Sequence, residues 1–333
     1  MKLATFIFEK QEAVGAVHSD AGTVVPLQEN HRKQHGKRKS FFEDMLSFIG
    51  GGDAAREAAE KTVSTATITI PLNEVTLCSP VPRPESIRDC ISFEQHIINC
   101  IRRVGLKKIA PMDELLERAF GRKRSLAGLM NRAWYERPVY YKSNRFSVVG
   151  DGAKVVRPAY TQQLDYELEW GIFIGKQGRD IPVARAREHI AGYAVFNDFS
   201  ARDIQLREQA ARLGPAKGKD FDTGNAVGPW MVTPDEIPAP YNLRMSATIN
   251  GELWSAGTTA DMHWSFEEIV SHISKSETLY PGEFIGSGTC SGAEGCGCGL
   301  EMGKFLSPGD EVVLSVENIG TLTNRIVSSF DEV

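Results

Sequence analysis

Residues 166–205 place the strongest constraint on how this chain folds. They begin with aromatic and β-branched residues punctuated by glycine, a composition typical of a β-strand. Strand side chains alternate between faces, so Glu167 and Glu169 project to the same side, about 6.5–7 Å apart. A second apolar run ends at Asp198. Like charges this close are unfavourable unless a cation or a proton separates them. Three carboxylates from two strands therefore predict an all-oxygen site for a hard divalent cation.

The pattern Glu-x-Glu alone also fits a solvated strand face, because charged residues are mostly exposed. Its neighbours Leu168, Trp170 and Phe173 are too apolar for an open surface strand. At this point the two interpretations remain equally open.

The composition excludes several classes of protein. The chain has 333 residues, 41% hydrophobic and 24% charged, which is ordinary for a globular protein. A net charge of −5 gives no reason to expect nucleic acid or an anionic membrane as a partner. No apolar run is long enough to span a membrane, and the N-terminus resembles a strand rather than a signal peptide. The six cysteines fit a reducing compartment, so cytoplasm is the expected location.

The pattern of elements predicts two domains. Residues 1–77 alternate short strands with helices over 41–49 and 53–62, which indicates a small N-terminal α/β domain. The basic, polar segment 30–39 is predicted to be a loop. A proline-rich extended linker follows, and 78–333 forms the catalytic domain, in which 105–140 is a lid or an insertion.

Two local patterns in the second domain make sharper predictions. Apolar residues at helical spacing within 86–104 predict a helix there, with Ser92 as its N-cap and His96 inside its first turns. Asn250-Gly251, between two alternating segments, predicts a tight β-hairpin.

From about residue 70 to the end, the order and rough spacing of the motifs resemble the fumarylacetoacetate hydrolase family. The motif Asn-Asp-x-Ser-Ala-Arg-Asp-x-Gln is highly specific, whereas the single glycine turns are weak. The matching segments are 167–169, 197–205, 218–223, 228–230, 250–251, 288–292 and 308–310.

The resemblance implies a mostly β (α+β) fold, a rolled mixed β-sheet with short flanking helices, and a homodimer. It also implies a divalent metal, Mg²⁺ first with Ca²⁺ or Mn²⁺ as alternatives, and chemistry on small 1,3-dicarbonyl or 2-oxo acid substrates. The positions that match the family's metal ligands are Asp89, Glu167, Glu169 and Asp198. As sequence alone, Asp89 also fits a helix cap or a surface acid.

The resemblance further identifies His96 as the catalytic histidine, although a lone histidine among isoleucines is usually structural. In the lyase, decarboxylase and isomerase branch, a glutamate often follows that histidine by three residues, where this chain has Asn99. In the namesake hydrolase the partner is a glutamate beyond the Gly-Thr-x-Ser-Gly loop, and Glu301 lies in roughly that place. This pattern favours hydrolysis, with a surface acid as the alternative for Glu301.

The remaining site residues follow from the same resemblance. Lys219, Arg202 and Gln205 are expected to stabilise the oxyanion and the carbanion leaving group. The alternative for Arg202 is a structural ion pair with Asp203 or Asp220, and the alternative for Lys219 is a solvated loop position. Tyr141 and Thr289 are expected to contact substrate.

Cys296 and Cys298, with Cys290 nearby, also suggest a soft-metal site. The sequence places no histidine close to them, so small residues in a tight loop are favoured over zinc. A redox-sensitive thiol is a further alternative.

The predicted function is metal-dependent hydrolysis of a C–C bond in a fumarylacetoacetate-like acylpyruvate or β-diketone. The alternatives are a decarboxylase, isomerase or hydratase of a 2-oxo acid, or a catalytically silent metal-binding scaffold. The presence of His96, Lys219 and Glu167 argues against the scaffold.

Overall fold

The computed structural model of the chain describes residues 1–292 and 295–332, and they form a mixed α/β fold in which sheets dominate. The largest is a 12-stranded sheet with the order β4-β3-β2-β1-β15-β13-β11-β19-β6-β7, in which β5 pairs with β1 and β8 with β15. Its strands are β1 Lys2–Phe8, β2 Gln11–His18, β3 Thr23–Pro26, β4 Ile70–Pro71, β5 Thr76–Leu77, β6 Ile87–Cys90, β7 Tyr140–Ser143, β8 Val148–Val149, β11 Glu169–Ile174, β13 Ile190–Asp198, β15 Asn225–Val232 and β19 Phe284–Gly286.

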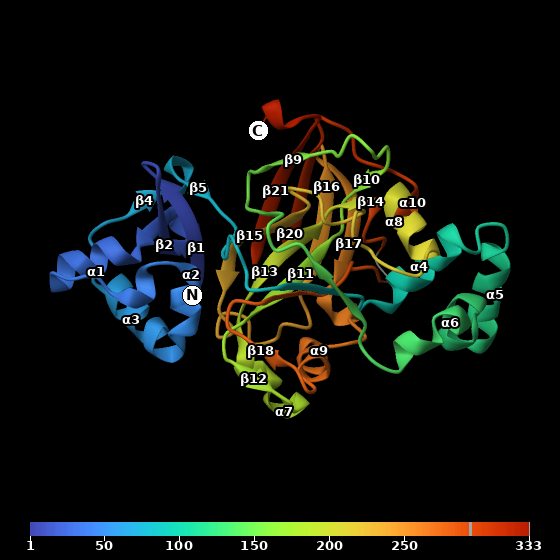
Figure 1. Cartoon of the computed structure of the whole chain (residues 1–333), viewed down its shortest axis with the longest axis horizontal. Helices are drawn as coiled ribbons and strands as arrows, with labels where there is room; N and C mark the ends of the chain where they lie inside the picture. The colour runs from blue at the N-terminus through green and yellow to red at the C-terminus, as the bar shows by residue number, and fades with distance from the viewer. Residues whose placement is uncertain (293–294, 333) are drawn as a thin grey trace.

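A second sheet of five strands packs against the first in the order β17-β16-β20-β21-β9 (Figure 1). Its strands are β9 Lys154–Val156, β16 Arg244–Ile249, β17 Glu252–Thr258, β20 Glu311–Val316 and β21 Gly320–Val327. Two small pairs join β10 Leu164–Asp165 to β14 Ser200–Ala201, and β12 Gly178–Arg179 to β18 Thr278–Leu279. The helices are α1 Leu27–His35, α2 Met45–Gly50, α3 Gly52–Ser64, α4 Glu94–Val104, α5 Ala110–Phe120, α6 Leu126–Met130, α7 Val183–Ala186, α8 Arg202–Ala210, α9 Phe266–Ile273 and α10 Gly299–Met302.

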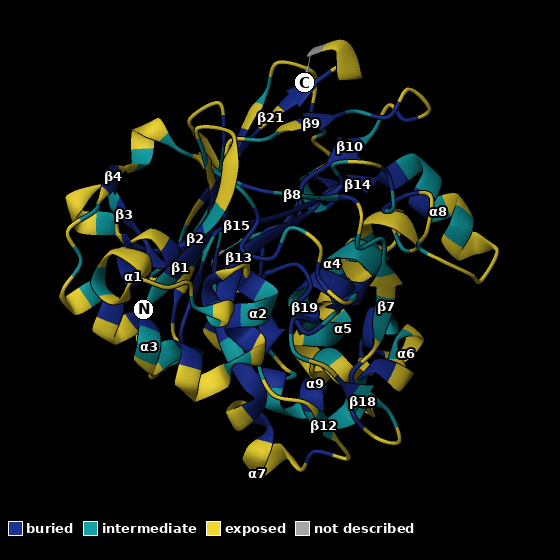
Figure 2. Cartoon of the chain, turned by 60° about the vertical axis from the view of Figure 1, so that its left-hand side comes forward, coloured by how far each residue is buried: buried dark blue, intermediate teal, exposed yellow. Residues whose placement is uncertain are grey.

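The central strands of the large sheet are buried on both faces. In β11, Trp170 and Ile172 point into the core shared with the five-stranded sheet and α9, whereas Phe173 points to the opposite core, shared with α2 and α3. Strands buried on both sides read as continuous apolar runs, as the sequence of β11 does. The same interior is visible as dark blue strands in Figure 2, beneath exposed residues of α7 and α3.

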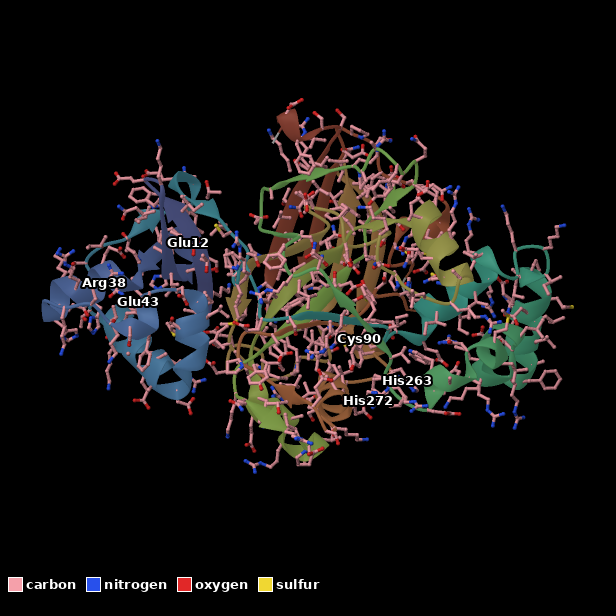
Figure 3. All side chains as sticks on the ribbon, in the orientation of Figure 1. Glu12, Arg38, Glu43, Cys90, His263 and His272 are labelled. Atoms are coloured by element: carbon pink, nitrogen blue, oxygen red, sulfur yellow. The ribbon has the colours of Figure 1, made fainter. Side chains whose placement is uncertain are left out.

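The N-terminal unit continues the large sheet instead of standing apart from it. Strand β1 pairs antiparallel with β15, with Lys2 opposite Val232. Glu12, Arg38 and Glu43 lie on this unit, far from Cys90, His263 and His272 in the rest of the chain (Figure 3). The predicted boundary between the N-terminal and catalytic domains falls at the end of β5.

One local prediction was wrong and two are confirmed. Most of segment 30–39 belongs to α1 rather than a loop, because the buried Asn30 side chain satisfies its amide on the backbone of residues 67 and 68. The helix predicted within 86–104 is α4, which contains His96 in its first turn and has Phe93 rather than Ser92 as its N-cap, and strand β6 precedes it. The hairpin at Asn250-Gly251 joins β16 to β17, and both residues have positive φ, as a type I′ turn requires.

Among the described residues, no helix is both long and apolar enough to cross a membrane.

Candidate active site

Four acidic side chains gather on one face of the large sheet because of strand parity and strand order. Glu169 lies at the start of β11, two residues after Glu167, and Asp198 ends the neighbouring strand β13. Asp89 lies on β6, which is separated from β11 by β19 alone. At that point β19 contributes Gly286, and an added Cβ there would lie 2.4 Å from Asp89 Oδ1. The missing side chain leaves the space between the carboxylates open.

The carboxylates are close enough to share one ion. Single oxygen atoms of Asp89, Glu167 and Glu169 all lie within 4.8 Å of one another, and all three residues are buried. Asp198 is not part of this tight trio, but it is close enough to interact electrostatically with Asp89. Among the described residues, its buried Oδ1 atom has no hydrogen-bond partner. A buried, all-oxygen donor set with an unpartnered oxygen fits a hard divalent cation.

The pKa values of these acids reflect their crowding. Burial, together with the charge of Asp198, raises the pKa of Asp89 to about 8. Burial and the charges of Asp89 and Glu167 raise the pKa of Glu169 well above its usual range. Burial has the same effect on Glu167, but the cations Arg202 and Lys219 outweigh it and lower its pKa. Without a cation, the crowding therefore favours the protonated form of Asp89 and of Glu169.

Lys219 and Arg202 are buried against the acidic cluster. The Lys219 ammonium donates to Glu167 Oε2 and, at 2.6 Å, to Asp198 Oδ2, and Tyr141 donates its hydroxyl to the same Asp198 oxygen. The Arg202 guanidinium donates to Glu167 Oε1 at 2.8 Å and to Asp165 Oδ2 at 2.8 Å. The alternative pairings with Asp203 and Asp220 are therefore not the contacts these cations make.

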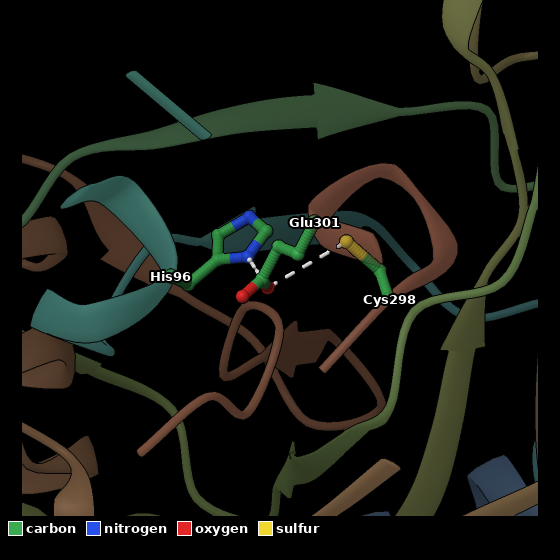
Figure 4. Close-up of side chains that lie close together, drawn as sticks. All are labelled: His96, Cys298 and Glu301. Carbon is green, nitrogen blue, oxygen red and sulfur yellow. Dashed lines mark hydrogen bonds and ion pairs between the residues drawn. The ribbon is translucent and has the colours of Figure 1, made fainter. Parts of the chain in front are cut away.

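His96 and Glu301 form a hydrogen-bonded pair from two short helices (Figure 4). His96 Nδ1 lies 2.8 Å from Glu301 Oε1, although the two residues are far apart in the sequence. Ser291 donates to the same oxygen at 2.5 Å, and Asn99 donates to Glu301 Oε2. Burial lowers the pKa of His96, but hydrogen bonds with Cys298 and Glu301 outweigh it and raise that pKa to about 10. The imidazole is thus fixed in orientation and, without a neighbouring cation, positively charged at neutral pH.

A cavity of about 400 Å³ joins these groups. Asp89, Glu167, His96, Lys219 and Thr289 all line it. So do the predicted site residues Tyr141, Arg202 and Gln205, and Met130, Asn131 and Trp134 of the 105–140 segment, whereas Glu169, Asp198 and Glu301 do not line it. Gln205 Oε1 accepts from Arg202 at 2.9 Å, and Thr289 donates to Glu169 Oε1 at 3.5 Å.

The sequence interpretation missed the residues that support the site from behind. Asp165 accepts from Arg202 and from the backbone N–H groups of Gly299 and Leu300, at 2.7 and 2.9 Å, so it ties the start of α10, and with it Glu301, to Arg202. Its two-residue spacing from Glu167 was a readable signal, because it continues the Glu-x-Glu alternation towards the N-terminus. Asn197, whose side chain accepts from the Glu167 backbone N–H at 3.0 Å, carried no such signal.

Gly286→Ala is expected to weaken metal binding by about 10–100-fold, the scale seen when groups supporting metal ligands are lost. The new methyl group would meet Asp89 Oδ1 and the Phe196 ring, at 2.4 and 2.8 Å, and overpacking of this kind costs about 1–3 kcal/mol. Titration calorimetry with Mn²⁺ and thermal unfolding measure both effects. Gly50→Ala is the control, since nothing lies within 4 Å of its added Cβ. Equal affinity in the Gly286 variant and the wild type would contradict the placement of the site.

The sequence and the fold are similar to those of known proteins. Residues 119–327 match the fumarylacetoacetate (FAA) hydrolase C-terminal family. Human oxaloacetate tautomerase FAHD2A, mitochondrial, is 30% identical over 283 residues, which cover 85% of this chain and 79% of that protein. The fumarylacetoacetate hydrolase of Exiguobacterium antarcticum superposes with a TM-score of 0.74 at 25% identity, over 99% of this chain and 100% of that one. Maleylpyruvate hydrolase from Sphingobium sp. SYK-6, solved with manganese (II) and pyruvate, superposes with a TM-score of 0.71 at 21% identity, over 99% and 100% of the two chains. The chain belongs to the fumarylacetoacetate hydrolase family.

Proposed function

We propose that this protein is a metal-dependent hydrolase that cleaves a C–C bond in a fumarylacetoacetate-like acylpyruvate or β-diketone. The observation that carries the proposal is the His96–Glu301 pair, 2.8 Å apart, beside a cavity that also exposes the acidic cluster and Lys219. A general base next to a cation site and a buried ammonium is the combination that water-driven cleavage of a β-dicarbonyl needs.

The cation would be held by Asp89, Glu167, Glu169 and Asp198. We propose Mg²⁺, with Ca²⁺ or Mn²⁺ as alternatives, because the donors are all oxygen, and the manganese in the maleylpyruvate hydrolase complex supports a divalent ion. When bound, it would neutralise the carboxylates, stabilise enolate charge on the substrate and lower the pKa of the nearby imidazole.

Each of the remaining site residues has a proposed role in the reaction. His96 takes a proton from water, and the hydroxide adds to the acyl carbonyl carbon. Lys219 and the Gln205 amide donate hydrogen bonds to the resulting oxyanion, while Arg202 holds Gln205 through its Oε1. The C–C bond breaks with its electron pair left on the enolate fragment, and His96 returns its proton to that carbon. The products are a carboxylate and a 2-oxo acid or ketone. Tyr141 and Thr289 line the cavity as proposed contacts for substrate oxygens.

Glu301→Gln is expected to lower the maximal rate and to move the acidic limb of the pH–rate profile to lower pH. A general base acts only when deprotonated, so activity rises with pH as His96 loses its proton. The charge of Glu301 raises the pKa of His96, and the variant removes it. The rate loss should stay below the about 10²–10⁴-fold lost with a whole general base, since the imidazole remains. Glu114→Gln on the exposed surface of α5 is the control. A limb that moves to higher pH would contradict the assignment.

Product analysis tests the reaction itself. The metal-loaded enzyme is incubated with a panel of acylpyruvates and β-diketones, with Mg²⁺, Mn²⁺ or Ca²⁺, and the products are followed by NMR in H₂¹⁸O. Hydrolysis places one ¹⁸O atom in the new carboxylate. Hydrolysis would be rejected if members of the panel react without ¹⁸O in the product carboxylate. It would also be rejected if the enzyme acts on oxaloacetate but on no member of the panel.

A second candidate is proton transfer or decarboxylation on a 2-oxo acid, and the human relative named an oxaloacetate tautomerase favours tautomerisation. The same His96 would move a proton between C3 and the enol oxygen without a bond to water. Exchange of C3 protons in D₂O, with no cleavage, would distinguish it from hydrolysis.

Location and assembly stay predictions. The free thiols of all six cysteines fit the proposed cytoplasmic location, which a fluorescent fusion would test. Light scattering coupled to size exclusion would test the proposed homodimer.

A further inference from the structure

Two thiols lie directly against the His96–Glu301 pair. Cys100 follows His96 by one helical turn in α4, and its Sγ lies 3.8 Å from Nδ1 and 3.7 Å from Nε2 of that ring. Cys298 precedes α10, and its Sγ lies 3.6 Å from Glu301 Oε1 (Figure 4). Cys298 also lies close enough to His96 to raise its pKa, and Cys100 lies close enough to Cys298 to raise the pKa of that thiol. Each of the four side chains therefore contacts at least two of the others.

These four groups supply one nitrogen, two sulfurs and one carboxylate oxygen, a donor set typical of zinc. Zinc–ligand distances of about 2.0–2.3 Å in a tetrahedron place the ligand atoms about 3.3–3.8 Å apart. With His96 Nδ1 as the nitrogen ligand, the Cys298–Glu301 contact of 3.6 Å and the Cys100–His96 contact of 3.8 Å already match that spacing, and the His96–Glu301 contact of 2.8 Å has only to open slightly. Ligand atoms of His96, Cys298 and Glu301 all lie within 4.8 Å of one another.

We propose that His96, Cys100, Cys298 and Glu301 form a second metal site, selective for soft divalent cations of the Zn²⁺ class and distinct from the all-oxygen site. Binding forms two metal–sulfur bonds, one metal–nitrogen bond and one metal–oxygen bond. It releases the two thiol protons and the imidazolium proton of His96 to solvent, with no change of oxidation state. Two thiolates and one carboxylate around a divalent ion leave one negative charge. The buried guanidinium of Arg202 lies close enough to both Cys298 and Cys100 to interact with their charges, and it offsets that excess.

The ion has a route to this site. His96 and Cys100 line the same cavity as Asp89 and Glu167, so a cation in this cavity can reach them, whereas Cys298 and Glu301 lie outside its lining. Glu301 and Cys298 complete the coordination from behind. The donor types separate the two sites, because thiolate and imidazole favour zinc whereas carboxylates favour Mg²⁺.

Occupation of this site would switch the enzyme off. A metal-bound imidazole has no free lone pair to accept a proton from water, and Glu301 could no longer orient it. This consequence rests on the proposed function, whereas the metal site itself does not.

Cobalt(II) spectroscopy tests the site without reference to activity. Reduced protein held in excess Mg²⁺ is titrated with Co²⁺, and we expect thiolate-to-cobalt charge-transfer absorption in the near ultraviolet and the visible bands of tetrahedral cobalt. Equimolar Zn²⁺ should bleach both. Cys100→Ser and Cys298→Ser should each abolish or strongly reduce the charge-transfer band, whereas Cys78→Ser, on the linker after β5, should leave it unchanged. Cobalt bound without thiolate absorption, or absorption that persists in both variants, overturns the proposal.

Inhibition forms the second arm. Zn²⁺ should inhibit the Mg²⁺-loaded enzyme. The Cys100→Ser/Cys298→Ser double variant should need at least about 10–100-fold more Zn²⁺ for half inhibition of its own activity, because losing even a group that only supports a metal ligand weakens metal binding by that factor. If no substrate is turned over at all, the proposed function fails while the cobalt spectra still decide the site. If turnover is normal and equally zinc-sensitive in the double variant, the inhibitory role is rejected and the proposed function stands.

Discussion

Replacing His96 with alanine is expected to lower kcat/KM by about 10²–10⁴-fold, the contribution of a positioned general base. The chain should still fold, because alanine is a strong helix former within α4 and Glu301 keeps its hydrogen bonds from Ser291 and Asn99. Metal binding should also persist, since His96 is not one of the four acidic ligands and forms no hydrogen bond with them. Steady-state kinetics and Mn²⁺ calorimetry measure the two properties separately.

The same variant carries a stability signature that depends on pH. The pKa of His96 is raised to about 10 by its hydrogen bonds with Cys298 and Glu301, which outweigh burial. A group whose pKa is raised on folding stabilises the protein fully below its unfolded pKa of about 6.5, and that stabilisation is lost as pH rises through the folded value. The loss of Tm in His96→Ala should therefore be larger at pH 6 than at pH 10. His18→Ala, on an exposed end of β2, is the control. Unchanged turnover in a folded, metal-binding His96 variant would remove the general-base assignment.

Glu169→Gln is expected to abolish turnover and to remove the stabilisation that a divalent cation provides. Ligand at 100 times its Kd stabilises a native protein by about 2.7 kcal/mol, and the variant should show almost none of this gain. In metal-free protein, burial and the neighbouring carboxylates raise the pKa of Glu169 and so favour its neutral form, and the neutral amide should therefore change Tm little. The variant and the wild type should therefore differ in Tm only when Mg²⁺ or Mn²⁺ is present.

Thermal unfolding with a chelator and with each cation checks this pattern. Glu43→Gln, an exposed acid on the N-terminal unit (Figure 3), should behave like the wild type in both conditions. Full turnover of the wild type after exhaustive chelation, or an undiminished metal-induced rise of Tm in Glu169→Gln, would show that the acidic cluster does not hold the catalytic ion.

The sequence predicted well those features that depend on near neighbours along the chain. The alternation of Glu167 and Glu169 follows from strand geometry, and the structure places both on the face predicted. The turn at Asn250-Gly251 follows from the φ angles that these two residues tolerate. The motif at 197–205 identified the family before any contact was known.

Local patterns failed where distant backbone supplied a missing partner. Segment 30–39 is polar and basic, so it read as a loop, yet Asn30 is buried in α1 because the backbone at residues 67 and 68 completes its hydrogen bonds. Asp89 fitted a helix cap by its neighbours alone, but the pairing of β6 with β19, nearly two hundred residues later, makes it a strand residue in the site. Neither the hydrogen bonds of Asn30 nor the pairing of β6 with β19 produces a pattern of apolar and polar residues within the segment concerned.

The sequence by itself determined which side chains can bind a cation, which strand face they occupy and to which family the chain belongs, because these properties depend on residue type and on spacing within one element. Only the tertiary structure decided that β19 brings Gly286, without a side chain, against the Asp89 carboxylate. It also decided that Lys219 pairs with Glu167 and Asp198, and that two cysteines flank the His96–Glu301 pair. These contacts join residues from separate elements, and strand order and helix packing, which no single segment encodes, set their distances.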